Sequence, residues 1–318
     1  MKIAIHVEQL DHRGCGTVTY DYSAGMKDCL GYEPIIISSG PKSTCPISKY
    51  SEFKTILYDS DLDIPSIVDK EKIDVFYAAK GGLIGECPSP DCLPKNCKTS
   101  IHCVFNMSEP HGDRYAGVSE WLAKKYNNNS WVPHIINLPK TDDTLHDELS
   151  IPRDAFVVGR LGGYEQFDIH FVKQTLVDVI NSRKDMWAIF LNTRQFIDHP
   201  KIRFLPFTAS NLYKTKFINT TDMMLHARSD GETFGLAIGE FSSRNKPIFT
   251  FDAAYPQYAR AHIHILGEKA ILYKTPQELF AYLLQIDKNY VQNVEWDCYS
   301  ERFSPQNVMR KFNEVFIK

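Results

Sequence analysis

Two acidic residues in the second half of the sequence, Glu232 and Glu240, stand eight positions apart around a predicted junction of loop and helix. The apolar run Met223–Leu225 predicts a strand that leads into this loop. Glu232 then lies just before the helix and Glu240 in its second turn, so both can face the strand ends. Carboxylates beside a phosphate site suit hydroxyl groups, one on a sugar and one on a ribose. The alternative is that Glu232 only caps the helix and Glu240 is solvated.

The same junction predicts a place for the phosphate itself. The helix is expected to begin near Phe234, so that the backbone N–H groups of Phe234, Gly235 and Leu236 point out of its N-terminus. Such an end attracts phosphate, and Gly235 lets a ligand approach the backbone closely.

An arginine and a glycine turn follow another predicted strand in the segment Val157–Gly163. Arg160 stands at the carboxyl edge of this strand, where a fixed cation can stabilise the charge on a departing diphosphate. The alternative for Arg160 is an ordinary ion pair on the domain surface.

A second glycine-rich turn, Arg13–Thr17, comes after the first predicted strand and opens a helix. A diphosphate can approach backbone amides at such a turn. The full dinucleotide fingerprint Gly-x-Gly-x-x-Gly is absent, because the turn continues as Val18-Thr19-Tyr20.

The elements that must position these residues alternate along the chain: short apolar, β-branched runs are followed by amphipathic stretches. This alternation predicts βαβ units and parallel sheets. The predicted strands are Ile3–Val7, Pro34–Ser38, Thr55–Tyr58, Asp74–Ala78, Ser100–Phe105, Ala155–Gly159, Trp187–Leu191, Ile202–Leu205, Met223–Leu225 and Pro247–Phe251. The predicted helices include Thr17–Leu30, Ile64–Glu71 and Ser119–Lys125, and three more that begin at Asp168, at the capping box of Thr275 and at Ser304-Pro305.

Two α/β domains with a cleft between them account for this pattern. Residues 1–138 are expected to form the first Rossmann-like domain and residues 150–303 the second, joined by the polar segment 140–147. A C-terminal helix over residues 304–318 is expected to pack back on the first domain.

Composition narrows the class of protein. The chain has 318 residues, of which 43% are hydrophobic, so two domains can each bury a core. Its net charge of −3 argues against a nucleic-acid partner, which calls for a basic face. The first residues have no signal-peptide pattern, and no apolar run is long enough for a transmembrane segment. A cytoplasmic protein is therefore expected.

The pattern Gly-Glu-x-Phe-Gly-Leu-x(4)-Glu, from Gly231 to Glu240, resembles the Glu-x(7)-Glu motif of family-4 glycosyltransferases. Its flanks occur in the same order, with Ile202–Leu205 and Asp222–Leu225 before the motif and Pro247–Phe249 after it. The resemblance implies the α/β fold named GT-B, in which two Rossmann-like domains place parallel sheets on either side of a cleft. It also implies a retaining transferase that needs no metal and no cofactor beyond its nucleotide-diphosphate-sugar donor.

The resemblance further implies roles for single residues. Glu232 would lie beside the donor sugar, Glu240 would hold the ribose, and Arg160 would neutralise the diphosphate. Gly16 would face the donor phosphates from the first domain. The residues expected to bind the donor are Gly14, Gly16, Gly162, Arg228, Gly231, Thr233, Phe234, Gly235, Leu236 and Glu240, and the expected catalytic residues are His102, Arg160 and Glu232.

His102 matches the place where these enzymes carry a histidine at a strand end near the donor sugar. A neutral imidazole there could bind a sugar hydroxyl and orient the ring. The nearby turn Glu109–Asp113 is expected to touch the acceptor through His111 and Asp113. A lone histidine is more often structural, so that alternative stays open for both histidines.

One position departs from the family. Relatives supply a lysine five or six positions after the arginine, where this chain has Glu165 and Gln166. Arg228, just before the glutamate motif, is the proposed replacement.

Two groupings resemble metal sites and are interpreted otherwise. Asp59-Ser60-Asp61 imitates the Asp-x-Asp motif of the other main glycosyltransferase fold, GT-A, but its residues favour a turn. The cysteines of a proline-rich segment lack the paired two-residue spacing of zinc sites, so free thiols are expected, with a structural metal or disulfide as the alternative: Cys87, Cys92, Cys97 and Cys103.

The sequence thus predicts transfer of a sugar from a UDP- or GDP-sugar to a hydroxyl of a glycan, glycoprotein or small acceptor, with retention of configuration. One alternative is a nucleotide-sugar epimerase on the same architecture. The other is a catalytically silent protein that binds nucleotide sugars, which the missing lysine favours.

Overall fold

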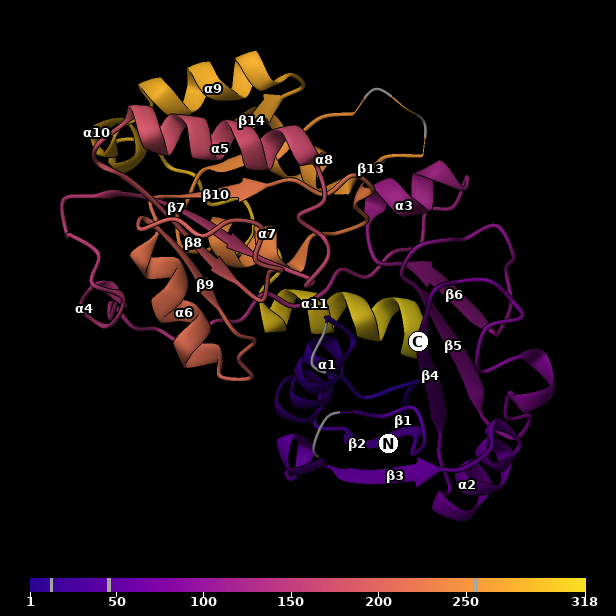
Figure 1. The fold of residues 1–318 in the computed structure, drawn as a ribbon. Helices are drawn as coiled ribbons and strands as arrows, with labels where there is room; N and C mark the ends of the chain where they lie inside the picture. Colours follow the sequence, from indigo (N-terminus) through magenta and orange to yellow (C-terminus); the bar gives the residue numbers. More distant parts are fainter. Residues whose placement is uncertain (12–13, 45–46, 254, 256) are drawn as a thin grey trace. The chain divides into compact units, whose positions relative to one another are not determined.

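The structure is a computed structural model that describes residues 1–11, 14–44, 47–253, 255 and 257–318. Arg13 of the predicted glycine-rich turn lies outside the described residues. The chain forms two compact units, which are considered separately (Figure 1). Unit 1 comprises Met1–Ile135 and Glu301–Lys318, and unit 2 comprises Ile136–Ser300.

Unit 1 is built on a six-stranded parallel sheet in the order β3-β2-β1-β4-β5-β6. Its strands are β1 Lys2–Val7, β2 Glu33–Ser39, β3 Lys54–Tyr58, β4 Val75–Lys80, β5 Lys98–Cys103 and β6 Arg114–Gly117. Its helices are α1 Gly14–Leu30, α2 Ile64–Glu71, α3 Glu120–Lys125 and α11 Pro305–Phe312, which continues as the π-turn η5 Asn313–Ile317. Short 3₁₀ turns occur at η1 Ile47–Tyr50, η2 Asp61–Asp63 and η3 Pro90–Cys92.

The central strands of unit 1 are buried on both faces, which explains why they are continuous apolar runs rather than alternating ones. Ile35, Ile36 and Ile37 of β2 are each 0% exposed. In register, Ile3 of β1 lies opposite Pro34 of β2 on one side and Val75 of β4 on the other.

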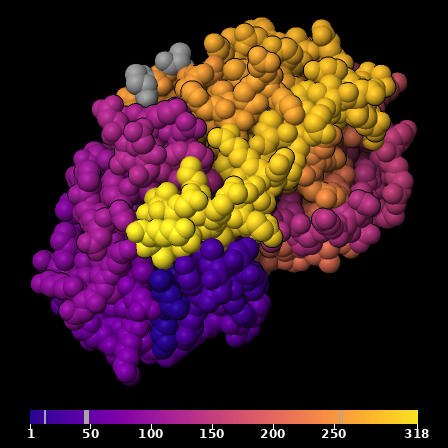
Figure 2. All heavy atoms as spheres, turned by 180° about the vertical axis from the view of Figure 1, so that it is seen from behind, coloured from indigo at the N-terminus to yellow at the C-terminus, as the bar shows by residue number. Residues whose placement is uncertain are grey.

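The C-terminal helix α11 belongs to unit 1 because its apolar side packs against α1. Ser304 caps α11 and Pro305 occupies its first turn, as the sequence predicts. Gly25 of α1 allows the close approach, since a Cβ there would come within 2.8 Å of Met309 Cγ. The space-filling view in Figure 2 shows the C-terminal residues (yellow) bordering the N-terminal ones (indigo).

Unit 2 repeats the design with a six-stranded parallel sheet in the order β14-β12-β10-β7-β8-β9. Its strands are β7 Phe156–Leu161, β8 Met186–Leu191, β9 Ile202–Leu205, β10 Met223–His226, β12 Ile248–Phe251 and β14 Ala270–Tyr273. A second, two-stranded sheet pairs β11 Gly231–Glu232 with β13 Ala259–Arg260. The helices are α4 His146–Leu149, α5 His170–Ser182, α6 Asn211–Thr220, α7 Leu236–Ser242, α8 Ala261–Leu266, α9 Pro276–Gln285 and α10 Lys288–Gln292, with the 3₁₀ turn η4 Gly267–Lys269.

Both six-stranded sheets have the same topology when the strands are counted within each unit. The first strand lies in the middle and is flanked by the second and the fourth, which is the doubly wound Rossmann order. The predicted α/β class with two Rossmann-like halves is therefore confirmed.

Several details differ from the sequence prediction. Asp168 does not cap α5, which begins at His170 without a side-chain cap, because the Asp168 carboxylate accepts hydrogen bonds from Ser229 instead. The segment expected to be a plain linker includes the short helix α4. Asp59-Ser60-Asp61 forms the expected turn, in which Ser60 caps η2. Cys87, Cys92, Cys97 and Cys103 are all free thiols.

Four fully buried histidines predict that the fold loses stability in mild acid. Burial lowers the pKa of His6, His134 and His262 to about 3 and that of His102 to about 4. In the unfolded chain a histidine titrates near pH 6.5, so between about pH 6.5 and pH 4 the unfolded state binds protons that the folded state does not. The free energy of unfolding should therefore fall by about 1–2 kcal/mol per histidine from pH 7 to pH 5. Urea unfolding at the two pH values measures this, and equal stabilities would contradict it.

Candidate functional site

The residues singled out in the second half of the sequence gather at the carboxyl edge of the unit 2 sheet. Neighbouring strands β7 and β10 end there, one in Arg160 and Leu161 and the other in His226. These strands flank the topological switch point of a Rossmann sheet, where ligands bind in open α/β folds. A pocket at this edge is lined by Arg160, Leu161, Gly162, Gln166, His226, Ala227, Arg228, Glu232, Gly235, Ala237 and Ile238.

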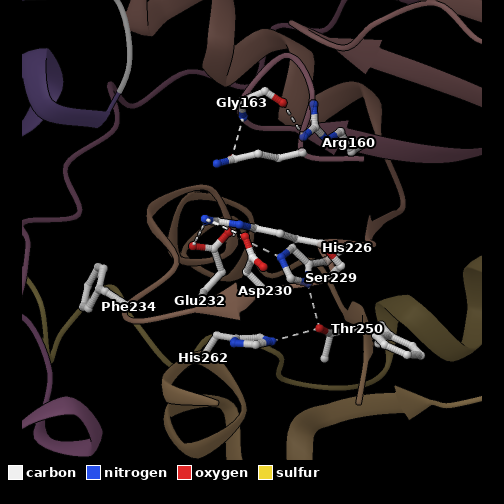
Figure 3. Close-up of polar contacts among 12 residues, drawn as sticks. Arg160, Gly163, His226, Ser229, Asp230, Glu232, Phe234, Thr250 and His262 are labelled. Atoms are coloured by element: carbon white, nitrogen blue, oxygen red, sulfur yellow. Dashed lines mark hydrogen bonds and ion pairs between the residues drawn. The ribbon is translucent and has the colours of Figure 1, made fainter. Parts of the chain in front are cut away.

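Arg160 forms one wall of the pocket and is itself held firmly. Its side chain donates to the Asn192 carbonyl at 3.1 Å and the Thr193 hydroxyl at 2.6 Å. It also donates to the Gly163 carbonyl at 2.7 Å (Figure 3). The residue is only 4% exposed. Burial lowers its pKa to about 10, so the guanidinium remains charged at neutral pH.

The glycine turn after β7 is shaped around this guanidinium. A Cβ on Gly162 would lie 2.9 Å from a terminal nitrogen of Arg160, so the turn needs glycine for this close approach. The Gly162 carbonyl accepts from the Asn192 side chain at 2.9 Å, and the Gly163 N–H donates to Gln166 at 3.3 Å. Arg160 therefore organises the loop as well as supplying charge.

Arg228 and Glu232 form an ion pair on the opposite wall. Their Nη1 and Oε2 atoms are 3.0 Å apart, and the side chains are 17% and 22% exposed. Burial alone would raise the pKa of the Glu232 carboxyl, but His226 and the charge of Arg228 outweigh it and lower this pKa to about 2. Arg228 Nε is buried and has no hydrogen-bond partner among the described residues.

A chain formed by His226, Thr250 and His262 supports the Glu232 carboxylate. His226 Nδ1 lies 2.8 Å from the Thr250 hydroxyl, which lies 3.0 Å from His262 Nε2 (Figure 3). The other nitrogen of His226, Nε2, is 3.5 Å from Glu232 Oε1. These three supporting residues come from β10, β12 and α8, and sequence reasoning missed all of them.

Asp168 ties the two loops of the pocket together. Its carboxylate accepts from the backbone N–H of Ser229 at 2.8 Å and from the Ser229 hydroxyl at 2.7 Å, and its own N–H donates to the Ala227 carbonyl at 3.2 Å. The Tyr255 hydroxyl also donates to the Ser229 carbonyl. The loop after β10 is therefore fixed to the loop after β7.

Two glycines of the glutamate motif are required by the backbone. Gly231 has a φ of +68°, and a Cβ there would lie 2.1 Å from the Ala259 carbonyl oxygen of the paired strand β13. Gly235 has a φ of +86° and is the N-cap of α7. The helix begins at Leu236, two residues later than predicted.

Phe234 and Thr233 do not line the pocket described above. The Phe234 side chain is 2% exposed, its ring packs against Tyr299 at 5.7 Å, and Figure 3 shows it apart from the polar cluster. Its position favours a role in the core over contact with a ligand.

Glu240 lies in α7 and pairs with Lys214 of α6. Both side chains are nearly buried, at 10% and 13% exposed, and Glu240 does not line the pocket. The sequence analysis did not single out Lys214, because nothing in the pattern of α6 marks it.

His102 is placed inside unit 1. It is 0% exposed, and its two ring nitrogens lie 2.7 Å from the Tyr77 hydroxyl and 2.8 Å from the Val132 carbonyl. Both nitrogens thus have protein partners, and the structural alternative accounts for His102 better than contact with a ligand does.

The expected acceptor-side residues, Asp113 and His111, both lie in unit 1. The Asp113 carboxylate accepts from the N–H and the hydroxyl of Thr99 at the amino end of β5, so it lies at the edge opposite the strand carboxyl ends. His111 binds the Glu109 carbonyl at 2.6 Å and lies 5.5 Å from the Tyr115 ring.

The helix α1 begins at Gly14, three residues earlier than predicted, so Gly14–Thr17 of the expected turn belong to the helix. Gly16 is buried against the preceding loop, where a Cβ would lie 2.0 Å from the Asp11 carbonyl oxygen, and its own carbonyl accepts from the Tyr50 hydroxyl at 3.1 Å. Close packing thus requires a glycine at position 16.

The pocket of unit 2 can bind an anion next to a hydroxyl-bearing group. Two further carboxylates, Asp168 and Asp230, lie near the arginines, but of the charged residues that line the pocket two are arginines, Arg160 and Arg228, and one is a carboxylate, Glu232. That carboxylate, ionised at neutral pH, is a hydrogen-bond acceptor for hydroxyls. In the described ranges no group of three or more His, Cys, Asp or Glu side chains is placed to hold a metal ion. Within those ranges no helix is long and apolar enough to cross a membrane.

Comparison with known proteins identifies the fold. No family model and no curated sequence matches the chain. A glycosyltransferase of Rickettsia africae is 14% identical with a TM-score of 0.70, over 99% of this chain and 97% of the other. HepE of Anabaena, solved with UDP and glucose, is 15% identical with a TM-score of 0.75, over 99% and 98% of the two chains. MurG of Acinetobacter baumannii is 12% identical with a TM-score of 0.63, over 99% of both. The chain therefore has the GT-B fold that the sequence predicts.

Proposed function

We propose that the protein is a glycosyltransferase that moves a sugar from a nucleotide-diphosphate sugar to a hydroxyl acceptor with retention of configuration. The observation that carries the proposal is the pocket of unit 2, where Arg160 and Arg228 flank the ionised Glu232 at the switch point of a GT-B sheet. The likeness to HepE, which was solved with UDP and glucose, supports UDP over GDP as the nucleotide.

Each part of the pocket takes one part of the donor in this proposal. The guanidinium groups of Arg160 and Arg228 hold the diphosphate, with the backbone around Gly162 and Gly235 as its floor. Glu232 accepts a hydrogen bond from a hydroxyl of the sugar. Glu240, which lies on α7 outside the pocket lining, accepts one from the ribose. Unit 1 supplies the acceptor side, to which His111 and Asp113 remain assigned as predictions, while Gly14 and Gly16 remain predicted contacts of the donor phosphates.

The reaction follows from the placement of charge. As the bond between the sugar and the diphosphate breaks, negative charge grows on the departing phosphate. Arg160 is already fixed by three hydrogen bonds, so it stabilises that charge without reorganising. Arginines supply the positive charge, so the proposed reaction requires no metal ion. The acceptor hydroxyl attacks from the face that the phosphate leaves, and that phosphate takes its proton.

One specific observation favours a binding protein without turnover as the second candidate. The position of the family lysine is held by Glu165, which pairs at the surface with Arg194 at 3.5 Å, and Arg228 is partly neutralised by Glu232. The cationic charge available to a leaving group is therefore lower than the family pattern implies. Binding of the donor without transfer or hydrolysis would identify this second function.

A nucleotide screen tests the proposal. We expect UDP to raise the melting temperature more than GDP, ADP or TDP, because a ligand that binds only the folded state stabilises it by mass action. UDP-sugars that bind are then incubated with glycan and small hydroxyl acceptors, and release of UDP and the glycosylated product are measured. Release of an epimerised free donor would indicate the epimerase instead. A chain whose melting temperature responds to none of these nucleotides would contradict every nucleotide-sugar function considered.

A further inference from the structure

The buried imidazole of His226 has an unexplained nitrogen that points at the proposed sugar site. His226 is 6% exposed and lines the pocket of unit 2. Its Nε2 has no hydrogen-bond partner among the described residues, yet it lies 3.5 Å from Glu232 Oε1. A buried polar atom without a partner is costly, so its orientation calls for a reason.

The charge state of Glu232 decides which nitrogen of His226 carries a proton. Glu232 forms an ion pair with Arg228, whose Nη1 lies 3.0 Å from Oε2, so near neutral pH the carboxylate is ionised and can only accept hydrogen bonds. A bare Nε2 lone pair facing this carboxylate would be repelled, whereas an N–H is attracted. Nε2 must therefore be protonated.

The Thr250 hydroxyl makes this arrangement possible in both charge states of His226. When His226 is neutral, its Nδ1 is an acceptor, so Thr250 donates to it and accepts from His262 Nε2. When His226 is charged, its Nδ1 donates to Thr250, which then donates to His262 Nε2, and the neutral His262 carries its proton on Nδ1 in this arrangement. A hydroxyl is both donor and acceptor, so it can reverse while the heavy atoms keep their places.

We propose that His226 is a positioning residue for Glu232, held in place by the chain of Thr250 and His262. His226 Nε2–H fixes Oε1 of the carboxylate and Arg228 fixes Oε2, so the acceptor lone pairs left over point in one direction. That direction selects the hydroxyl geometry of the sugar that the pocket accepts. The inference rests on the proposed function, since it assigns Glu232 to a sugar hydroxyl.

A purely structural role for the chain is the competing explanation. It accounts for the 2.8 Å and 3.0 Å contacts of Thr250 but not for the unpartnered Nε2 that faces an ionised carboxylate at the pocket wall. The two explanations also differ in measurable ways. If the chain is only structural, changing it should lower the stability of the fold. If it positions Glu232, changing it should lower turnover and sugar recognition while the affinity for the diphosphate stays the same.

The first test determines whether Nε2 of His226 carries a proton. Nitrogen-15 NMR of the histidine rings in the free protein, with His226 assigned from a His226→Gln sample, should show a protonated Nε2 at pH 7. In Thr250→Val, the Nδ1 resonance of His226 should shift because its hydrogen-bond partner is gone. An unprotonated Nε2, or a spectrum of Thr250→Val identical to that of the wild type, overturns the inference.

The second test separates positioning from stability. Thr250→Val should lower kcat with a UDP-sugar by about 10-fold, since a small misplacement of a site group has large effects, while UDP affinity stays within about twofold. Thr250→Ser keeps the hydroxyl and should restore kcat. Thr175→Val, another buried threonine of unit 2 that lies on α5, is the matched control and should keep full kcat. Equal kcat in Thr250→Val and Thr175→Val contradicts positioning.

The outcomes distinguish a failure of the proposed function from a failure of the positioning role of His226. If the wild-type protein binds no nucleotide, the proposed function fails, while the NMR result still decides whether His226 presents an N–H to Glu232. If UDP binds and turnover occurs but the histidine spectrum shows an unprotonated Nε2, the proposed function stands and the positioning role fails.

Discussion

Replacing Glu232 by alanine is expected to lower turnover by about 100-fold or more while UDP still binds, because the carboxylate meets the sugar rather than the diphosphate. The structure holds this carboxylate between Arg228 at 3.0 Å and His226 at 3.5 Å, which keeps it ionised and oriented before any substrate arrives. Initial rates of UDP release with the best donor from the screen measure the effect. Calorimetric titration with UDP measures the affinity that should remain.

Glu232→Gln distinguishes charge from shape in the same position. Glutamine keeps the size of the side chain but brings an N–H₂ donor where the sugar hydroxyl needs an acceptor, so it should lose nearly as much turnover as alanine. Glu165→Ala is the control, because this glutamate is exposed and pairs only weakly with Arg194 at the surface. Turnover of Glu232→Ala close to that of Glu165→Ala would show that the sugar lies elsewhere.

The sequence predicted the architecture because the buried strands are recognisable one at a time. Runs such as Pro34–Ser38 and Trp187–Leu191 are mostly apolar and rich in β-branched or aromatic residues, and their alternation with helices predicts parallel pairing. The edge strand β6 was not predicted, since Arg-Tyr-Ala-Gly at 114–117 has no apolar run. The helix α6 was not predicted either, because its sequence Asn-Leu-Tyr-Lys-Thr-Lys-Phe-Ile-Asn-Thr has almost no amphipathic pattern.

The candidate site also contains residues that local motifs predict and residues that only the tertiary fold brings together. Glu232, Gly235 and Arg160 could be proposed because each stands in a short motif next to a predicted strand. The chain of His226, Thr250 and His262 could not, because its members come from three elements and meet only when β10 pairs with β12. At Asp168, by contrast, the local sequence predicts a helix cap that the structure does not have.

A carboxylate just before a helical pattern resembles a cap, and local sequence cannot reveal that Ser229, 61 positions away, competes for Asp168. The same limit applies to Lys214, whose partner Glu240 lies 26 positions further along. Contacts of this kind are set by the tertiary fold, which single-sequence patterns do not encode.

Replacing Arg160 by alanine is expected to affect both stability and turnover. The guanidinium binds the Asn192 carbonyl, the Thr193 hydroxyl and the Gly163 carbonyl, so alanine leaves buried polar atoms without partners. Because a lost hydrogen bond to a charged group costs on the order of 1.5–3 kcal/mol, the free energy of unfolding should fall by about 3 kcal/mol or more. Turnover should fall by about 100-fold or more, since the fixed charge beside the departing phosphate is lost.

Arg160→Lys separates these two effects. Lysine keeps the positive charge but cannot reach three acceptors with a planar fork, so the loop of Gly162 and Gly163 should loosen while part of the phosphate attraction remains. We therefore expect UDP affinity to decline in the order wild type, Arg160→Lys, Arg160→Ala, measured by titration with UDP, and stability to decline in both variants in urea unfolding. Arg194→Ala is the control, since that side chain is 70% exposed. If Arg160→Ala binds UDP as tightly as Arg194→Ala does, Arg160 only builds the loop, and Arg228 alone must hold the diphosphate.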